Sequence, residues 1–441
     1  MDTVFSARAL MGISLAFHII YATIGIGLPL LLMLAEGLAL RTGDDEYHTM
    51  ARHWIRSASV LFAIGAVSGT ILSFELGFLW PNFMSFAGGI IGIAFSMEGF
   101  AFFTEAIFIG IYLYGSRRLS RFALFLTTIP ITVASAASAA FVISANAWMN
   151  TPAGFQLVDG QVQSVDPFAA FFNPAWLHET LHGTTAAYVA TSFAVAGVYA
   201  WAMLRGRVTT YNKKALTLAM VVALVSLPLM LLTGDMNAQF LAVEQPAKLA
   251  AAEALFKTTA GAPLLIGGIP NAATQQVDYG IEIPKFLSLL AFRDPDATVT
   301  GLDAFPAGTT PDPVIVHLSF DSMVGSFFIM LLALGWFWWI RWRKHDVPLN
   351  RLPLLAILVA SPFGLIALEM GWFVTEFGRQ PWIAANTMRV AEAVTPRSEV
   401  GLVLVLFLLV YLALTIGLLF LLLRPTPART GVPTPAEAHH A

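Results

Sequence analysis

Ionisable side chains interrupt several long apolar runs of this sequence, and their types are those that bind iron or pass protons. Inside or at the edge of these runs stand His18, His182, Asp321, Met323, Glu98, Glu105, Glu369 and Glu376. An ionisable group inside a membrane is costly, so each one is a functional hypothesis by default. Imidazole and thioether groups bind haem iron, and carboxyl groups transfer protons. The set therefore predicts redox cofactors or an ion path.

A second pattern, His178-Glu179-Thr180-Leu181-His182, fits H-E-x-x-H, in which two histidines on one helix face bind zinc and the glutamate is the base. Only three of its positions are fixed, so chance matches are common. An intramembrane zinc protease also needs a third ligand from a distant span, usually an aspartate. No apolar run offers an Asp-Gly pair at depth, because Leu302-Asp303 lies in a loop. This absence disfavours the protease.

The composition indicates the class of protein that carries these residues. Of 441 residues 57% are hydrophobic and only 12% are charged, whereas soluble domains carry about 25% charged residues. The net charge is −3 without a basic run, so nothing indicates nucleic-acid binding. The chain has no cysteine, which excludes disulfides and thiolate metal sites. These numbers predict a polytopic membrane protein.

Runs of about 20 apolar residues cross a bilayer as helices, because a helix satisfies its own backbone there. The sequence predicts an all-α fold with nine transmembrane helices, over 10–37, 57–78, 88–114, 122–148, 180–204, 215–235, 317–340, 352–377 and 399–423. The first run is too long for a signal peptide and is expected to be a retained span.

The distribution of Lys and Arg predicts the orientation. One set of loops, with the C-terminal tail, holds 16 of the 24 basic residues and the other set holds eight. This bias places the N-terminus outside and the C-terminus in the cytoplasm. The predicted organisation is helices 1–6 in residues 1–235, an outer loop in 236–316, helices 7–9 in 317–424 and a disordered cytoplasmic tail in 425–441. Within the outer loop, 244–260 is expected to be a helix.

On helices oriented in this way, the candidate ligands gather in the outer half, beside the long outer loop. Glu98 and Glu105 are seven residues apart, about two turns, so they face one side of their helix. His48, His53, His345, His439 and His440 lie in inner loops or the tail and are assigned no role. A proton-coupled transporter that uses the four glutamates as its relay remains the alternative from another class.

One segment resembles a known family. Gly371-Trp372-Phe373-Val374-Thr375-Glu376-Phe377-Gly378-Arg379-Gln380-Pro381-Trp382 looks like G-W-x-x-x-E-x-G-R-Q-P-W of subunit I of cytochrome bd-type quinol oxidases. Five further segments resemble the family in the same order along nearly the whole chain: Arg8 to His18, Trp80 to Met84 with Glu98-Gly99, Ser144 to Met149, Leu181 to Thr184, and Ser319 to Gly325.

The resemblance implies three haems and assigns their ligands. His182 and Met323 match the axial pair of a low-spin haem b, ligation that leaves no open position and suits an electron relay. His18 matches the ligand of one high-spin haem and Glu376 that of the other, in an order that varies in the family. Trp372, one turn before Glu376, matches an aromatic residue that lies among the haems on the electron path.

The resemblance also implies roles in proton and quinol chemistry. Glu98, Glu105 and Ser138 match residues near the high-spin haems and their proton supply, Glu105 less firmly because some members have a spacing of eight. Lys248 and Glu253 match the quinol-binding segment of the outer loop; without the resemblance, the residues themselves favour a solvated helix face. Arg379 is expected to contact a haem propionate, by charge complementarity; the alternative is an ordinary interfacial anchor.

Two departures from the family pattern matter. Asp321 stands where several members have arginine, so the charge near the low-spin haem differs. The outer loop lacks an extra insertion, so the chain resembles the short-loop branch, which includes the cyanide-insensitive oxidases. Some members of that branch have haem b in place of haem d, so the third group is either haem d or haem b. His178 matches nothing in the family.

The sequence therefore predicts a subunit of a terminal oxidase in the bacterial cytoplasmic (inner) membrane. Quinol is expected to be oxidised at the outer face and O2 reduced to water at the haems, with a membrane potential built without pumping. The resemblance implies a second large membrane subunit as partner, and in many members a small single-span one.

Overall fold

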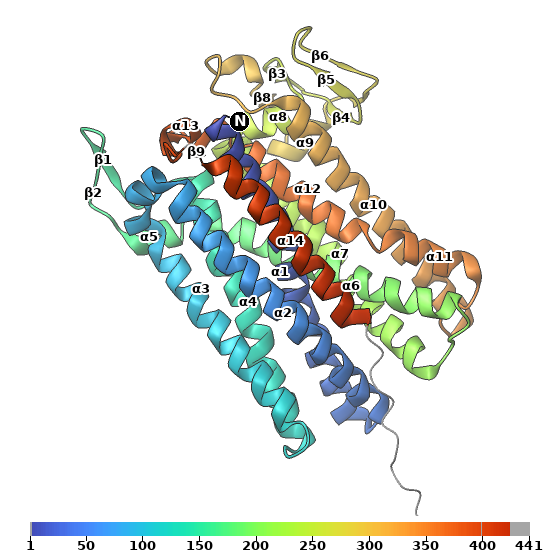
Figure 1. The fold of residues 1–441 in the computed structure, drawn as a ribbon. Coiled ribbons are helices and arrows are strands. Elements are labelled where there is room, and N and C mark those ends of the chain that lie inside the picture. The colour runs from blue at the N-terminus through green and yellow to red at the C-terminus, as the bar shows by residue number, and fades with distance from the viewer. Residues whose placement is uncertain (1, 398, 424–441) are drawn as a thin grey trace, which may run out of the picture.

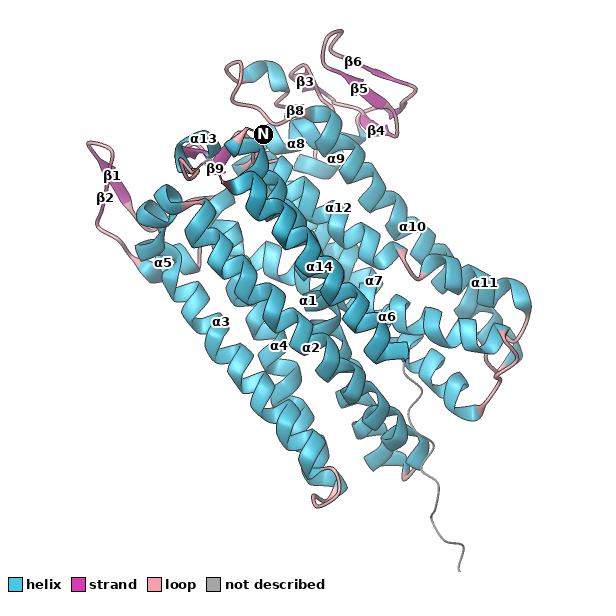
Figure 2. Cartoon of the chain, viewed as in Figure 1, coloured by secondary structure: helices cyan, strands magenta, loops and turns pink. Residues whose placement is uncertain are grey.

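The computed structural model describes residues 2–397 and 399–423. Within that part, nine helical segments are long and apolar enough to cross a membrane, which confirms the predicted all-α fold. They form one bundle of helices (Figure 1), joined by loops and short strands (Figure 2). The spans are α1 (Thr3–Thr42), α2 (Asp45–Leu79), α3 (Pro81–Gly115), α4 (Arg121–Asn150), α6 (Trp176–Leu204), α7 (Thr210–Glu244), α10 (Pro313–Lys344), α11 (Arg351–Ala360) with α12 (Phe363–Phe377), and α14 (Val400–Leu423).

The two ends of the bundle differ in how much chain they carry. One end, the long-loop end, holds the start of α1 and the segments 151–175, 245–312 and 378–397; it lies at the top of Figure 1. The opposite short-loop end holds 43–44, 116–120, 205–209 and 345–350. The loops predicted to be cytoplasmic all lie at the short-loop end. The predicted tail, 425–441, lies outside the described residues.

The long-loop segments contain short elements that the sequence did not predict. Segment 151–175 forms the hairpin β1 (Gln156–Val158) and β2 (Gln161–Gln163) with helix α5 (Pro167–Phe171). Segment 378–397 holds β9 (Trp382–Ala384), β10 (Met388–Arg389) and α13 (Val390–Ala393). Segment 245–312 contains α8 (Pro246–Ala252), α9 (Phe286–Phe292), the 3-10 turn η1 (Leu302–Ala304), and strands β3 (Thr259–Ala260), β4 (Leu264–Ile266), β5 (Ile269–Asn271), β6 (Gln276–Asp278), β7 (Ile281–Ile283) and β8 (Thr298–Val299).

Several helix boundaries differ from the predicted ones. The helix α2 begins at Asp45 and α7 continues to Glu244, because polar residues at the membrane surface extend helices beyond the apolar run. Side chains of Asp2, Ser120, Thr209 and Asp312 cap the starts of α1, α4, α7 and α10 by accepting backbone N–H bonds. The predicted helix over 244–260 is wrong: α8 ends at Ala252, and Ala254 adopts a positive φ of 47°. The eighth span is broken at Ser361-Pro362.

Close helix approach depends on small residues, as is common in membranes. A Cβ placed on Gly27 of α1 would lie 2.2 Å from Oγ1 of Thr191 in α6. A Cβ on Gly364 of α12 would lie 2.6 Å from the Cα of Ala190. These contacts bring α1, α6 and α12 together in the centre of the bundle, where the candidate ligands lie.

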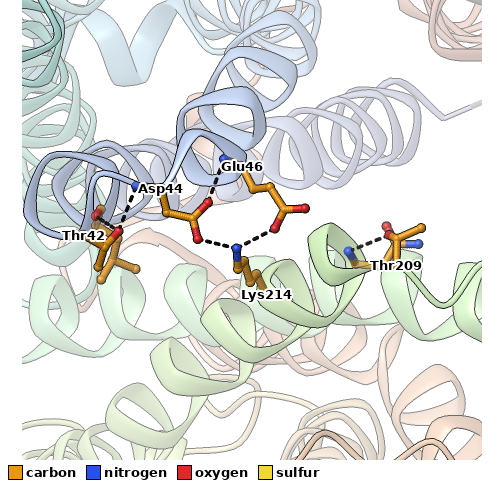
Figure 3. A network of polar contacts seen from close by, with 7 residues as sticks. Thr42, Asp44, Glu46, Thr209 and Lys214 are labelled. Atoms are coloured by element: carbon orange, nitrogen blue, oxygen red, sulfur yellow. Dashed lines mark hydrogen bonds and ion pairs between the residues drawn. The ribbon is translucent and has the colours of Figure 1, made fainter.

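A cluster of charges ties helices together at the short-loop end (Figure 3). Lys214 of α7 donates hydrogen bonds to the carboxylates of Asp44 and Glu46, at the turn between α1 and α2. The hydrogen bond from Lys214 holds the pKa of the Asp44 carboxyl below its usual range. Because these groups are partly exposed, the cluster is expected to fix the turn rather than contribute much free energy of unfolding.

Candidate active site

His18 of α1 is held in one orientation by α2. Its Nδ1 lies 2.9 Å from Oγ of Ser68, and the Ser68 hydroxyl donates to the carbonyl of Ile64 at 2.9 Å. Since the serine proton is used in that bond, the Nδ1–H of His18 is the donor, and Nε2 carries the free lone pair. A Cβ on Gly69 would lie 3.1 Å from Cε1 of His18, so glycine leaves room for the ring.

His182 of α6 repeats this arrangement against α7. Its Nδ1 lies 3.3 Å from Oγ1 of Thr233, whose hydroxyl donates to the carbonyl of Leu229 at 3.0 Å. A Cβ on Gly234 would lie 3.5 Å from Cε1 of the ring. For both histidines, the side-chain hydrogen bond that orients the ring is made by Nδ1. An imidazole with Nδ1 fixed and Nε2 free is the form that binds a metal.

Met323 of α10 lies beside the start of the G-W-x-x-x-E segment. A Cβ on Gly371 of α12 would lie 3.2 Å from Sδ of Met323, so the absence of a side chain at Gly371 leaves space around the sulfur. The following residue, Trp372, is half-buried on α12, one turn before Glu376. A thioether and an imidazole are the donor types of the predicted low-spin haem pair, and their assignment as its ligands stays a prediction.

Glu376, the other predicted ligand, is bound on both oxygens. Oε1 accepts a hydrogen bond from Nδ2 of Asn146 in α4, and Oε2 forms an ion pair with Arg379. Arg379 also donates to the carbonyl of Ile383, and its buried Nε has no hydrogen-bond partner in the described residues. The structure thus pairs two predicted site residues with each other, and the predicted propionate contact of Arg379 stays a prediction.

The predicted proton-supply residues lie on two neighbouring helices. Oγ of Ser138 in α4 lies 3.4 Å from Oε1 of Glu98 in α3, a long hydrogen bond. Glu105 is buried two turns further along α3. The structure therefore brings Glu98 and Ser138 together and places Glu105 on the same helix, toward the short-loop end.

Lys248 and Glu253 are buried, at 5% and 7% exposure, so the alternative of a solvated helix face is wrong. Nζ of Lys248 donates a hydrogen bond to Oδ1 of Asn150 at 2.5 Å. A Cβ placed on Gly378 would lie 2.7 Å from Cγ of Lys248, so the glycine leaves room for the lysine side chain. Burial lowers the pKa of Lys248 to about 8, against the opposing charge of Glu179. Burial and the charge of Asp321 raise the pKa of Glu253 to about 8.

Glu253 is positioned by the junction of α8 and α10. His317 of α10 is fully buried, and its Nδ1 lies 2.7 Å from the carbonyl of Ala252, which fixes the end of α8 beside α10. Oε2 of Glu253 has no hydrogen-bond partner in the described residues. A buried carboxylate oxygen without a partner is rare and indicates a ligand or water at this position.

Comparison with known proteins assigns the family. Residues 6–429 match the sequence profile of "Cytochrome bd terminal oxidase subunit I". The chain belongs to this family. It is 39% identical over 96% of both sequences to a Bacillus subtilis (strain 168) protein with the provisional name cytochrome bd menaquinol oxidase subunit I. It is 30% identical over 96% of this chain and 93% of the other to that organism's cytochrome bd ubiquinol oxidase subunit 1.

A solved structure agrees with the sequence comparison. The bd oxidase from Geobacillus thermodenitrificans matches with a TM-score of 0.91 and 39% identity, over 96% of this chain and 98% of that one. As a member of the cytochrome bd subunit I family, the chain is part of a terminal quinol oxidase of bacterial membranes, and the family implies haem cofactors. The transporter and protease alternatives are therefore not favoured.

In this bd subunit, the residues of the H-E-x-x-H pattern make contacts other than those of a zinc site. Among the described residues no three His, Cys, Asp or Glu side chains lie together as a metal site. The ring of His178 packs on Phe240 with centroids 5.1 Å apart. Glu179 instead lies within electrostatic reach of Lys248, Glu376 and Arg379. It thus lies near both Lys248 of α8 and Arg379 of the G-R-Q-P-W segment, a position that the local motif gave no means to predict.

The most useful signal missed in the sequence is a repeated dipeptide. Ser68-Gly69 and Thr233-Gly234 each combine a hydroxyl for Nδ1 of a histidine with space for its ring. They lie on helices next to those that carry His18 and His182. A hydroxyl residue followed by glycine inside an apolar run is the pattern that sequence reasoning needed to search for.

Proposed function

We propose that this chain binds three haems in the long-loop half of its bundle, oxidises quinol at the long-loop end and passes the electrons to O2. The observation that carries the proposal is the repeated histidine arrangement, in which a hydroxyl holds Nδ1 and Nε2 carries the lone pair. Buried metal ligands are normally oriented in this way by an outer partner. The reaction oxidises two quinols and reduces one O2 to two waters.

The ligands divide by the coordination they offer. His182 and Met323 bind the low-spin haem b, and His18 and Glu376 each bind one high-spin haem, either haem b with haem d or two haems b. When bound, these haems supply the electron relay and the oxygen-binding iron. Asn146 and Arg379 hold the Glu376 carboxylate in place. Trp372, one turn before Glu376 on α12, is the aromatic residue of the proposed electron path among the haems.

The quinol chemistry is assigned to two buried residues, Lys248 of α8 and Glu253 directly after that helix. Lys248, oriented by Asn150, donates a hydrogen bond to a quinol oxygen. The carboxylate of Glu253, whose Oε2 has no partner, accepts the proton of the quinol hydroxyl. A base with a pKa of about 8 is well matched to this task near neutral pH. The relatives are named for menaquinol and for ubiquinol, so the proposed substrate class is a quinol.

Protons consumed with O2 come from the opposite side of the membrane. Ser138 and Glu98 form the part of this path nearest the proposed haems, and Glu105 lies further toward the short-loop end. Quinol protons leave at the long-loop end, which the basic-residue bias places outside. Turnover then builds a membrane potential without pumping.

The partner is a second large membrane subunit, in some complexes with a small single-span one. Large apolar side chains are exposed on α3 and α14, among them Phe100 at 72% and Leu402 at 64%. Such faces pack against lipid or against helices of another subunit.

Met323→Leu in the purified complex tests the low-spin ligand pair. Leucine has a similar volume but no sulfur, so we expect the low-spin haem signal to be lost and quinol oxidation to fall. Met330→Leu is the matched control, since Met330 is a buried methionine of the same helix. An unchanged low-spin spectrum in Met323→Leu would rule out this ligand.

A further inference from the structure

Glu36 of α1 is a fully buried carboxylate near the short-loop end, far along the helix from His18. Two side chains from two other helices bond to Oε1. Nδ1 of His48 in α2 lies 3.0 Å away, and the hydroxyl of Tyr112 in α3 donates to the same oxygen. A carboxyl group at this depth is costly, and no role assigned so far explains it.

The network reaches the surface through His48. The side chain of His48 is 15% exposed, whereas Glu36 and Tyr112 are 0% exposed. Arg52, one turn after His48 on α2, lies within electrostatic reach of Tyr112. His48 is thus the member of the network that exchanges protons with water at the short-loop end. The sequence placed it in an inner loop, but it lies in α2.

Tyr112 also lies in line with two glutamates of α3. Tyr112, Glu105 and Glu98 follow one another at intervals of seven residues, so all three lie on one face of the helix. Each interval spans about 10.5 Å, which is too long for a direct hydrogen bond and fits bridging waters. The chain of groups leads from the short-loop surface to the Glu98–Ser138 pair.

The helix α4 packs against both α1 and α3 and supplies hydroxyls over this stretch. Thr128, Thr132 and Ser135 are buried, and each donates its proton to a carbonyl of its own helix. Their oxygen lone pairs stay available as acceptors. Buried water requires such polar partners, so α4 makes a hydrated path along α3 feasible.

We propose that His48, Glu36 and Tyr112 form the mouth of the path that delivers protons from the short-loop side to Glu105 and Glu98. This proposal rests on the proposed oxidase function and names the source of its protons. Each transfer breaks one N–H or O–H bond and forms another, so one proton enters at His48 for each that leaves toward Glu105. No group is oxidised or reduced.

A purely structural role would also explain the contacts, because they join α1, α2 and α3. Tyr112→Phe distinguishes proton transfer from a structural role, since it removes one hydroxyl and keeps the packing. Tyr199→Phe is the matched control. The Tyr199 hydroxyl accepts a 2.8 Å hydrogen bond from Trp54 and lies 3.4 Å from the Tyr211 hydroxyl. Tyr199 is also near the short-loop end, but it is not on the α3 face that carries Tyr112. Glu36→Gln and His48→Gln test the other two members.

The measurements use the purified complex in proteoliposomes with saturating quinol. We expect Tyr112→Phe and Glu36→Gln to lower O2 consumption about tenfold or more, with an increased solvent isotope effect in D2O. Haem content and the rate of haem reduction by quinol should match wild type, because neither needs protons from this side. Tyr199→Phe should behave as wild type, and His48→Gln should slow turnover in the same way.

The proposal is overturned if Tyr112→Phe and Glu36→Gln keep wild-type turnover, or if Tyr199→Phe slows turnover and raises the isotope effect as much as Tyr112→Phe does. Should a buried variant lose its haem, His48→Gln decides alone, because His48 is at the surface edge; its wild-type turnover would overturn the proposal. A wild-type complex with no quinol-dependent O2 consumption would instead overturn the proposed function, so the two failures are distinguishable.

Discussion

At the scale of single residues, this protein positions its candidate iron ligands with hydroxyl groups of neighbouring helices. Ser68 and Thr233 each bond a histidine Nδ1, and each is followed by a glycine that leaves space for the ring. Loss of an outer partner typically weakens metal binding by about 10- to 100-fold. The hydroxyls are therefore expected to matter almost as much as the ligands.

Thr233→Val should affect one haem and Ser68→Ala another. Valine keeps the shape of threonine but cannot orient His182, so we expect partial loss or a shifted midpoint potential of the low-spin haem. Ser68→Ala should leave that signal intact and alter the high-spin signals through His18. Redox titration followed in the visible spectrum measures both, and each variant is the control for the other. Identical effects of the two substitutions would contradict separate ligand assignments.

Quinol oxidation should depend on pH through Glu253. Only the ionised carboxylate accepts a proton, and burial with the nearby Asp321 charge raises its pKa to about 8. The rate should therefore rise as pH increases through about 8 and level off above it. Glu253→Gln should lower the rate by about 100-fold and remove this rise.

The matched control for this profile is Glu282→Gln, since Glu282 is exposed on β7 in the same loop. Initial rates of quinol oxidation between pH 6 and about 9.5 cover both sides of the expected rise. A Glu253→Gln enzyme that keeps the wild-type pH profile would show that another group is the base.

At the scale of elements, the sequence predicted which segments form helices but not where they end. Apolar runs identify spans, because burial in lipid requires them. Helix ends depend instead on local caps such as Asp44 before α2, and the short hairpins depend on turns with little burial. The candidate ligands His18, His182 and Met323 were recognisable by motif. Ser68 and Thr233, which bond the two histidines, were not recognisable, and neither was the position of Glu179 near Lys248, because helix packing brings these residues together.

Gly364→Ala should destabilise the protein at the contact between α12 and α6. The new Cβ would lie 2.6 Å from the Cα of Ala190, so the backbone must move, which costs about 1–3 kcal/mol. Gly335→Ala on α10 is the control, since a Cβ there has no atom within 4 Å among the described residues. Thermal unfolding of the purified complex should show a lower Tm for Gly364→Ala alone; equal Tm values would contradict the tight contact.

At the scale of the whole molecule, the proposal requires the long-loop end to face outward. The chain has no cysteine, so single cysteines can report exposure without background. Asp159→Cys in the β1–β2 turn and Arg118→Cys at the short-loop end mark the two sides. In intact cells, a membrane-impermeant maleimide should label Asp159→Cys and not Arg118→Cys. The reverse pattern would invert the orientation and with it the proposed direction of proton flow.

The central claim is that the long-loop half of this bundle holds haem on His182, Met323, His18 and Glu376. The most direct test is a dithionite-reduced minus air-oxidised visible spectrum of the purified complex, with pyridine haemochrome quantitation. We predict roughly three haems per copy of this chain, including one low-spin haem b. A chlorin band in the red would identify haem d, and its absence an all-haem-b enzyme. A flat spectrum from intact, folded complex would contradict the account.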